Sequence, residues 1–143
     1  MPDRFELLEL PEGQSVQLRQ SFGRCCLSTG FFDEFYDLFI ASSPEVAKRF
    51  ANTDLNKQKE MLKESLAWMV MSALGNDHAN GVVGTLAERH SRRSLDIQPH
   101  LYDFWLESLM TAIESHDRRN FKDLEKIWRT LLSKAIEFMK SQY

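Results

Sequence analysis

Three polar side chains interrupt helical rows of apolar residues, and their types suit the binding of a metal ion and of a small ligand. Tyr36, Gln58 and His90 each share a row with apolar residues at the three- and four-residue spacing of one helix face. A neutral imidazole can bind iron, and a phenol and an amide opposite it can donate hydrogen bonds to a polar diatomic ligand. A helical core can also hold any one of these residues if its hydrogen bonds are met. The rows therefore define a candidate site and leave both interpretations open.

The rows themselves predict a chain built from helices. Helices are expected over roughly residues 13–27, 32–42, 55–73, 83–90, 101–113 and 124–139. Thr53 or Asp54 and Asn120 are expected N-caps, Pro99 is expected in a first helical turn, and GNDHANG is expected to be a loop. No strand-like alternation persists. The sequence predicts an all-α fold in a single domain over residues 1–143, with residues 1–12 as an extended N-terminal segment.

Composition excludes several classes of partner. The net charge of −3 argues against a nucleic-acid-binding protein, which normally has a basic face. The longest apolar run, Ala67–Leu74, is too short to span a membrane, and MPDRFELLELPEG lacks the pattern of a secretory signal. Cys25 and Cys26 are adjacent, which suits neither a disulfide framework nor a metal site. We therefore expect a cytoplasmic protein with reduced thiols.

Three stretches carry a resemblance to a known family. FYDLFIASSPEVAKRF (35–50), NTDLNKQKEML (52–62) and LAERHSRRSLDIQPHLYDFW (86–105) occur in this order, with a step of 32 residues from Gln58 to His90. In this the sequence resembles the globins, specifically the single-domain bacterial haemoglobins and the haem domain of flavohaemoglobins. The resemblance implies the globin fold, with helices A, B, C, E, F, G and H and little or no D helix.

The resemblance also implies a cofactor and the residues that bind it. His90 matches the proximal histidine, the axial ligand of haem iron. Tyr36 and Gln58 match the distal positions, where Tyr36 can donate to a bound ligand and Gln58 can donate as well or orient the Tyr36 hydroxyl. The other expected haem contacts are Phe50, Leu62, Leu86, Leu95 and Tyr102. No Cys-x-x-Cys-His is present, so the expected cofactor is non-covalent haem b.

The remaining charged residues and histidines have simpler expectations. A carboxylate-bearing cofactor edge needs nearby cations, for which the candidates are Lys57, Arg89, Arg92 and Arg93. Tyr102 lies near the position of the tyrosine that polarises the proximal histidine in flavohaemoglobins, although the preceding corner is one or two residues longer. His78, His100 and His116 are expected to be solvated.

The implied function is reversible binding of oxygen and other diatomic ligands, nitric oxide and carbon monoxide among them. The alternatives are a nitric oxide dioxygenase that works with a separate reductase, a weak peroxidase, and a gas or redox sensor that acts through a partner protein. The 143 residues contain no flavin or nicotinamide domain, so electrons would have to come from elsewhere. A globin fold that has lost its haem is disfavoured because His90, Phe50 and Gln58 are retained. We expect a monomer or homodimer with no nucleic-acid or membrane partner.

Overall fold

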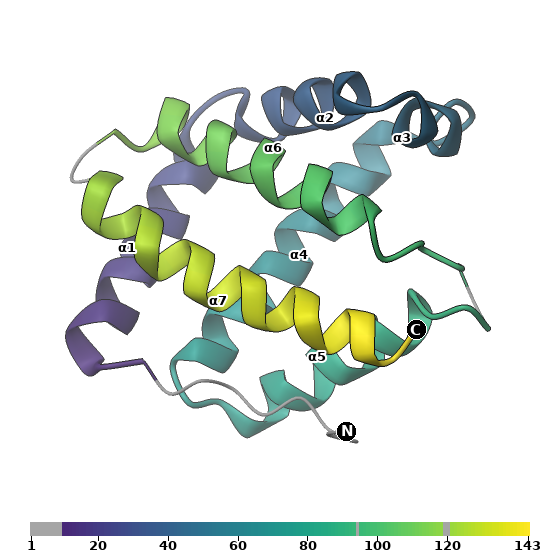
Figure 1. The fold of residues 1–143 in the computed structure, drawn as a ribbon. Coiled ribbons are helices and arrows are strands. Elements are labelled where there is room, and N and C mark those ends of the chain that lie inside the picture. The colour runs from purple at the N-terminus through teal and green to yellow at the C-terminus, as the bar shows by residue number, and fades with distance from the viewer. Residues whose placement is uncertain (1–9, 94, 119–120) are drawn as a thin grey trace.

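Seven helices make up the described portion of the chain. The computed structural model describes residues 10–93, 95–118 and 121–143, and these contain no strand. The helices are α1 (Glu12–Leu27), α2 (Phe31–Ser42), α3 (Pro44–Arg49), α4 (Leu55–Ala73), α5 (Asp77–Arg89), α6 (Leu101–His116) and α7 (Phe121–Ser141) (Figure 1). The all-α prediction is confirmed, and residues 50–54 between α3 and α4 contain a turn and no further helix. Most of the predicted extended segment 1–12, and the predicted cap Asn120, lie outside the described residues.

Short polar residues determine where the central helices begin. Ser43 caps α3 by accepting a hydrogen bond from the backbone N–H of Glu45, and Pro44 occupies the first helical position, which also ends α2. Asp54, one of the two predicted caps, accepts from the backbone N–H groups of Asn56 and Lys57 at the start of α4. These caps place Tyr36 in the middle of α2 and Gln58 in the first turn of α4.

The prediction that GNDHANG (75–81) forms a loop is wrong for most of this stretch. Only residues 74–76 lie outside helices, and Asp77–Arg89 forms α5. The Asn76 side chain accepts from the backbone N–H of Ala79, so this asparagine starts a helix. Gly75 adopts a positive φ of 90° just after α4, a conformation that glycine reaches without steric cost. Gly75 and Asn76 therefore mark a tight junction between two helices.

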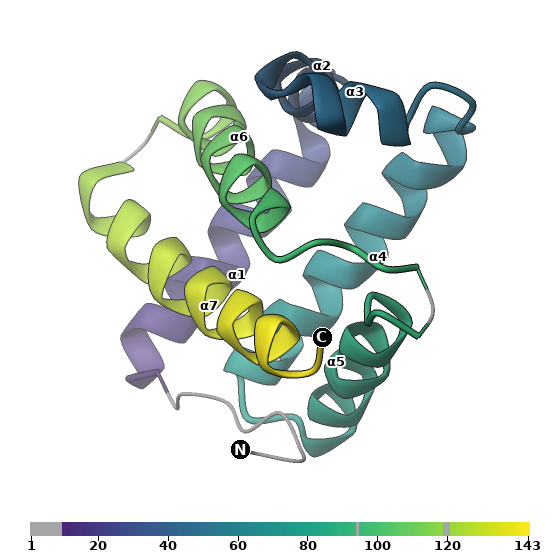
Figure 2. The ribbon, with the colours of Figure 1, turned by 45° about the vertical axis from the view of Figure 1, so that its right-hand side comes forward.

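The helices pack in pairs that cross one another. α2 packs against α6, and α4 packs against α5 along one side of the molecule (Figure 2). α7 contacts α1, α4, α5 and α6, and it crosses in front of α1 and α4 in Figure 1. The segment that follows α7 lies beside the end of α5, where the backbone N–H of Arg92 donates to the carbonyl oxygen of Tyr143.

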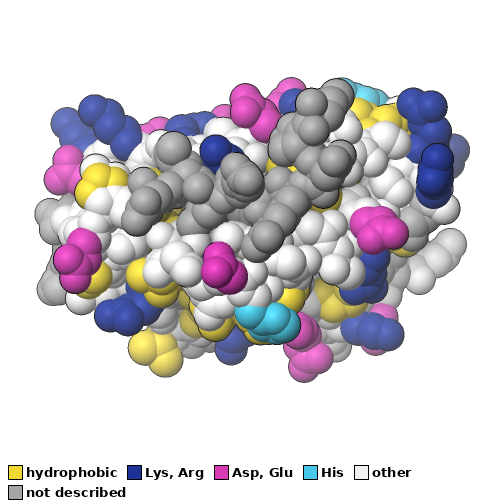
Figure 3. Space-filling model, turned by 90° about the horizontal axis from the view of Figure 1, so that it is seen from below, with side chains coloured by type: hydrophobic (Ala, Val, Ile, Leu, Met, Phe, Trp, Pro, Cys, Tyr) yellow, Lys and Arg dark blue, Asp and Glu magenta, His cyan; other side chains and the backbone are white. Residues whose placement is uncertain are grey.

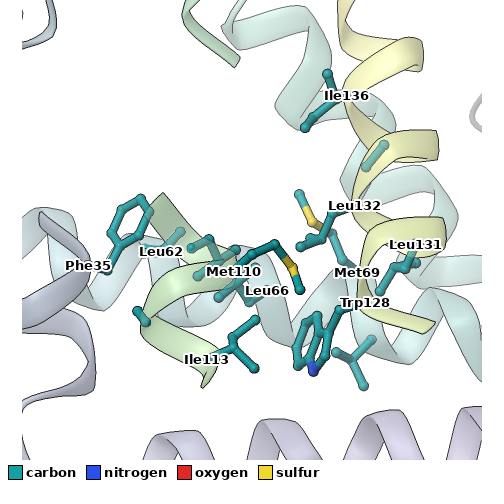
Figure 4. Packing of buried hydrophobic residues seen from close by; sticks show 14 of the residues in the cluster. Phe35, Leu62, Leu66, Met69, Met110, Ile113, Trp128, Leu131, Leu132 and Ile136 are labelled. Carbon is teal, nitrogen blue, oxygen red and sulfur yellow. The ribbon is translucent and has the colours of Figure 1, made fainter. Parts of the chain in front are cut away.

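The hydrophobic core lies where α2, α4, α6 and α7 meet. Figure 4 shows Trp128 and Leu132 of α7 facing Met110 and Ile113 of α6, with Leu66 of α4 behind them. Trp128, Leu66, Ile113 and Leu132 are each at most 1% exposed. The burial of these apolar side chains is the main contribution that stabilises the helical fold.

A buried carboxylate joins three helices at one end of this core. Asp117, which follows α6, accepts hydrogen bonds from Oγ of Ser21 at 2.6 Å and from Nε and Nη2 of Arg24 at 2.6 and 3.1 Å. Nε1 of Trp128 donates to the same Ser21 oxygen at 2.9 Å. The Asp117 side chain is 2% exposed, so these donors compensate the cost of burying its charge.

Two features of the described surface bear on possible partners. No described helix is both long enough and apolar enough to cross a membrane. On the face shown in Figure 3, basic and acidic side chains of the described residues are interspersed, and no patch of one sign dominates it.

Replacing Asp117 is expected to destabilise the fold strongly. Asp117→Ala leaves the buried Ser21 hydroxyl and the Arg24 guanidinium without their acceptor, which should lower the free energy of unfolding by about 2–4 kcal/mol. Glu107→Ala is the matched control, since it removes the carboxylate that Arg129 contacts in an exposed pair and should cost at most about 1 kcal/mol. Urea unfolding followed by circular dichroism measures both variants, and equal losses would contradict the role of Asp117.

Candidate functional site

Two adjoining cavities form one slot between α4 and α5, open toward the end of α3. They share lining residues from three places: Arg49 and Phe50 at the end of α3, Gln58, Met61 and Ser65 on α4, and Leu86, His90 and Ile97 on and after α5. We call the two cavities together the slot. The inner cavity is lined largely by apolar side chains of α2, α6 and α7, among them Phe39, Trp105 and Ile136. The outer cavity adds the polar residues Thr53, Glu64, Thr85 and Arg89.

His90 directly follows the last residue of α5 and lines both cavities. Its Nδ1 lies 2.8 Å from the carbonyl oxygen of Leu86, one helical turn earlier. Burial lowers the pKa of His90, the hydrogen bond to Leu86 raises it, and the charges of Arg89 and Arg49 lower it further, so the net shift is downward. The ring is therefore neutral at pH 7. Because Nδ1 must carry the proton to donate to a carbonyl, Nε2 carries the lone pair.

Tyr36 and Gln58 meet in a way that the residue types alone did not indicate. The Tyr36 hydroxyl donates to the backbone carbonyl oxygen of Gln58 at 3.1 Å, whereas the sequence suggested only the Gln58 side chain as its partner. Burial raises the pKa of Tyr36, so the phenol keeps its proton and remains a donor. Both residues line the inner cavity. The slot thus has one buried hydroxyl donor on the side formed by α2 and α4.

Aromatic and aliphatic residues complete the inner wall. Phe50 packs edge-on against Tyr36 and Phe39, with ring centroids 5.9 and 5.7 Å apart. Leu62 is 6% exposed and lines the inner cavity about a turn after Gln58, and Leu86 lines both cavities. Phe50, Leu62 and Leu86, three of the residues predicted from the sequence, thus all line the inner cavity.

Tyr102 and Leu95 occupy different regions of the slot. Tyr102 lines the inner cavity, and burial raises its pKa to about 12. His90 makes its ring hydrogen bond to Leu86, and within the described residues none joins it to the Tyr102 hydroxyl. Leu95 lines only the outer cavity and is 50% exposed, so it lies at the mouth.

The cations at the mouth differ in part from those expected. Of the four candidates, all described in the structure, Arg89 lines the outer cavity. The Arg92 guanidinium instead lies 4.7 Å above the Tyr143 ring, and Lys57 and Arg93 are exposed and line neither cavity. Arg49, which was not predicted from the sequence, lines both cavities and donates from Nη2 to the carbonyl oxygen of Leu95 at 2.7 Å. Arg49 directly precedes Phe50, but no periodic pattern marks it.

Besides Arg49, three residues that line both cavities were not predicted as site residues: Met61, Ser65 and Ile97. Met61 and Ser65 lie three and seven residues after Gln58, so helical periodicity could have placed them on the same face of α4. Ile97 lies outside any helix, where no periodic signal exists, and it is brought in by the turn that follows His90.

The other histidines are not all solvated as expected. His78 and His100 are exposed, although His78 contacts the edge of Trp68 and His100 lies 3.0 Å from Glu45. The prediction was wrong for His116, whose side chain is 16% exposed. Its ring nitrogens lie 2.6 Å from Oγ of Ser28 and 2.6 Å from Glu34, because the end of α6 packs against the junction of α1 and α2.

The residues of the slot fit a haem group. A flat apolar cofactor with one acidic edge requires apolar walls, an available nitrogen for its metal, and cations at the opening. The inner cavity supplies the apolar walls, and Nε2 of His90 supplies the nitrogen for the metal. Arg49 and Arg89 supply the cations at the opening. The described residues contain no group of three or more histidine, cysteine or acidic side chains that could hold a metal ion without such a cofactor.

Comparison with known proteins identified a similar solved structure. The chain is 42% identical to a protein of Pseudomonas aeruginosa PAO1 whose crystal structure is described as structurally highly homologous to a human hemoglobin. The similarity covers 91% of this chain and 98% of that chain, with a TM-score of 0.85. No family model and no curated protein sequence matches the chain.

The lowered pKa of His90 predicts a pH dependence for the protein without cofactor. Because the folded-state pKa lies below the ordinary value of 6.5, the unfolded chain binds more protons than the folded one as the pH falls past 6.5. The stability contributed by neutral His90 is therefore present above pH 6.5 and lost as the pH falls through the folded-state pKa. His90→Gln, which cannot titrate, should lose less stability over the same range. Urea unfolding of the two proteins at several pH values measures the difference, and identical pH profiles would contradict the prediction.

Proposed function

The chain belongs to the globin family, and from that premise we propose that it binds haem b in the slot, with His90 as the axial ligand, and reversibly binds a diatomic gas. The observation that carries the proposal is the neutral imidazole of His90, whose Nε2 lone pair is left available in a largely apolar slot by the Nδ1 hydrogen bond to Leu86. Haem iron, when bound, supplies the position at which a diatomic ligand attaches.

His90 would be held in place by its own helix. The Leu86 carbonyl keeps the proton on Nδ1 and limits rotation of the ring. A carbonyl is a weaker acceptor than a carboxylate, so this arrangement polarises the imidazole only moderately. That favours ligand binding over strongly peroxidase-like chemistry.

Tyr36 would act on the opposite side of the slot. Its hydroxyl has one proton, which the Gln58 carbonyl accepts in the structure. To donate to a gas ligand, the hydroxyl has to give up that hydrogen bond, so the ligand gains only the difference between two hydrogen bonds. The Gln58 side chain, which also lines the slot, is a second candidate donor.

Oxygen is the ligand that we propose first, with nitric oxide and carbon monoxide as further ligands. Polar donors favour oxygen, which carries partial negative charge in its haem complexes. Sustained turnover of nitric oxide would need electrons from a separate reductase. We propose a cytoplasmic location, where thiols such as those of Cys25 and Cys26 stay reduced.

Loss of the His90 imidazole is expected to weaken haem retention severely. His90→Ala removes the only bond that we propose between the protein and the metal, so haem affinity should fall by more than about tenfold. His100→Ala is the matched control, since it removes an exposed imidazole outside the slot. Haemin titration followed by the Soret absorption measures binding, and circular dichroism checks that both variants fold. Normal haem binding by the His90 variant would overturn the proposed function.

Removal of the Tyr36 hydroxyl should accelerate oxygen release moderately. Tyr36→Phe keeps the ring between Phe35 and Phe50 and removes one donor. Because the Gln58 carbonyl competes for the same proton, we expect about two- to tenfold faster release. Stopped-flow oxygen displacement measures the rate, with Tyr102→Phe as a control that removes another phenol of the slot. An unchanged rate in Tyr36→Phe would show that Tyr36 does not donate to the ligand, and an equal effect in Tyr102→Phe would show that the effect is not specific to Tyr36.

A further inference from the structure

The segment that follows His90 folds back on the histidine and forms one side of the slot mouth. We call residues 91–93 and 95–97 the His90 corner. The backbone N–H groups of Leu95, Asp96 and Ile97 donate to the carbonyl oxygens of Arg89, Ser91 and His90, at 3.0, 2.8 and 3.1 Å. Asp96 has a positive φ of 51°, which is uncommon outside glycine. The corner is thus a tight turn tied to the backbone of His90.

Several contacts attach the corner to the segment after α7. The Tyr143 hydroxyl donates to the Asp96 carboxylate at 2.5 Å, and the Tyr143 carbonyl accepts from the backbone N–H of Arg92 at 3.3 Å. The Arg92 guanidinium lies over the Tyr143 ring, 4.7 Å from its centre. On this side the corner has three points of attachment.

On the opposite side, one hydrogen bond between described residues joins the corner to the end of α3. Nη2 of Arg49 donates to the Leu95 carbonyl oxygen at 2.7 Å, a hydrogen bond between residues 46 positions apart in the chain. Arg49 lines both cavities of the slot, and Leu95 lies at its mouth. The contact therefore links the α3 side of the slot to the His90 side across the opening. Within the described residues, no carboxylate lies within ion-pair distance of Arg49 to compete for its guanidinium.

From this asymmetry we infer that Arg49 is the latch of the slot: its bond to Leu95 holds the His90 corner closed, and its release opens the mouth for exchange of the cofactor. The corner stays attached through Tyr143 while the Arg49 side opens, because one exposed hydrogen bond breaks more readily than three contacts. Arg49 acts through the corner and is therefore a positioning residue. The inference rests on the proposed haem site for its physiological meaning, whereas the contact itself is a property of the protein alone.

The test uses Arg49→Met, which keeps much of the aliphatic stem and removes the guanidinium. The matched control is Arg93→Met, which removes the same charge from an exposed residue of the corner that lines neither cavity of the slot. The first measurement is hydrogen exchange of the Leu95, Asp96 and Ile97 amides in the haem-free protein. The second is transfer of haemin from the loaded protein to an excess of an apo-globin acceptor.

Arg49→Met should speed exchange of the corner amides and haemin loss by about two- to tenfold, the range for one net hydrogen bond. Arg93→Met should leave both rates unchanged. Unaltered amide exchange in Arg49→Met would contradict the proposal that Arg49 holds the corner closed. Faster haemin loss without faster amide exchange would contradict it as well, because Arg49 would then act only as a partner for the cofactor carboxylates. Equal effects in Arg93→Met would show that charge at the mouth, not the contact, matters. If the wild-type protein takes up no haemin, the proposed function fails, and amide exchange still decides whether Arg49 holds the corner.

Discussion

The hydrogen bond from Nδ1 of His90 to the carbonyl oxygen of Leu86 determines which nitrogen of the ring can act in the slot. It keeps the proton on Nδ1 and leaves the Nε2 lone pair for a metal. The bond exists because His90 caps the end of α5, one turn after Leu86, whose carbonyl oxygen has a second lone pair besides the one that the His90 backbone N–H uses. Burial then keeps the ring neutral by lowering its pKa. The remainder of the fold has to present this nitrogen to a closed apolar space.

The packing of the helices creates that space without leaving the core open. α2 and α6 form one packed pair and α4 and α5 another, and α7 joins them through Trp128 and its neighbours. The slot is lined by the first residues of α6, whereas Asp117 follows the other end of that helix. The buried polar cluster of Ser21, Arg24 and Asp117 and the His116 contacts stabilise the junction of α1, α2 and α6. The core reaches the slot as well, since Phe39, Leu62 and Ile136 belong to the buried core and also line the inner cavity.

The opening of the slot combines rigid and weakly held segments. Short helix caps at Ser43, Asp54 and Asn76 define the walls, and the His90 corner closes them. A large flat group needs an opening that is wider than any opening between fully packed helices. The corner meets this need because its attachment on the α3 side consists of one exposed hydrogen bond from Arg49.

The sequence alone determined the features that depend on local periodicity. The apolar rows predicted the helices, and Asp54 was one of the two expected caps at the start of α4. The resemblance to the globins implied that Gln58 and His90 belong to the two sides of one site. The contacts between distant segments came only from the tertiary structure. The Tyr36 hydroxyl donates to the Gln58 carbonyl, and the Arg49 guanidinium donates to the Leu95 carbonyl. The His116 ring lies between the side chains of Ser28 and Glu34. The misassigned GNDHANG stretch shows the same limit, since glycine and asparagine suit both a loop and the cap between two helices. Periodicity reports which face of a helix is buried, whereas a hydrogen bond between two helices depends on how they cross, and no local pattern in the chain contains that angle.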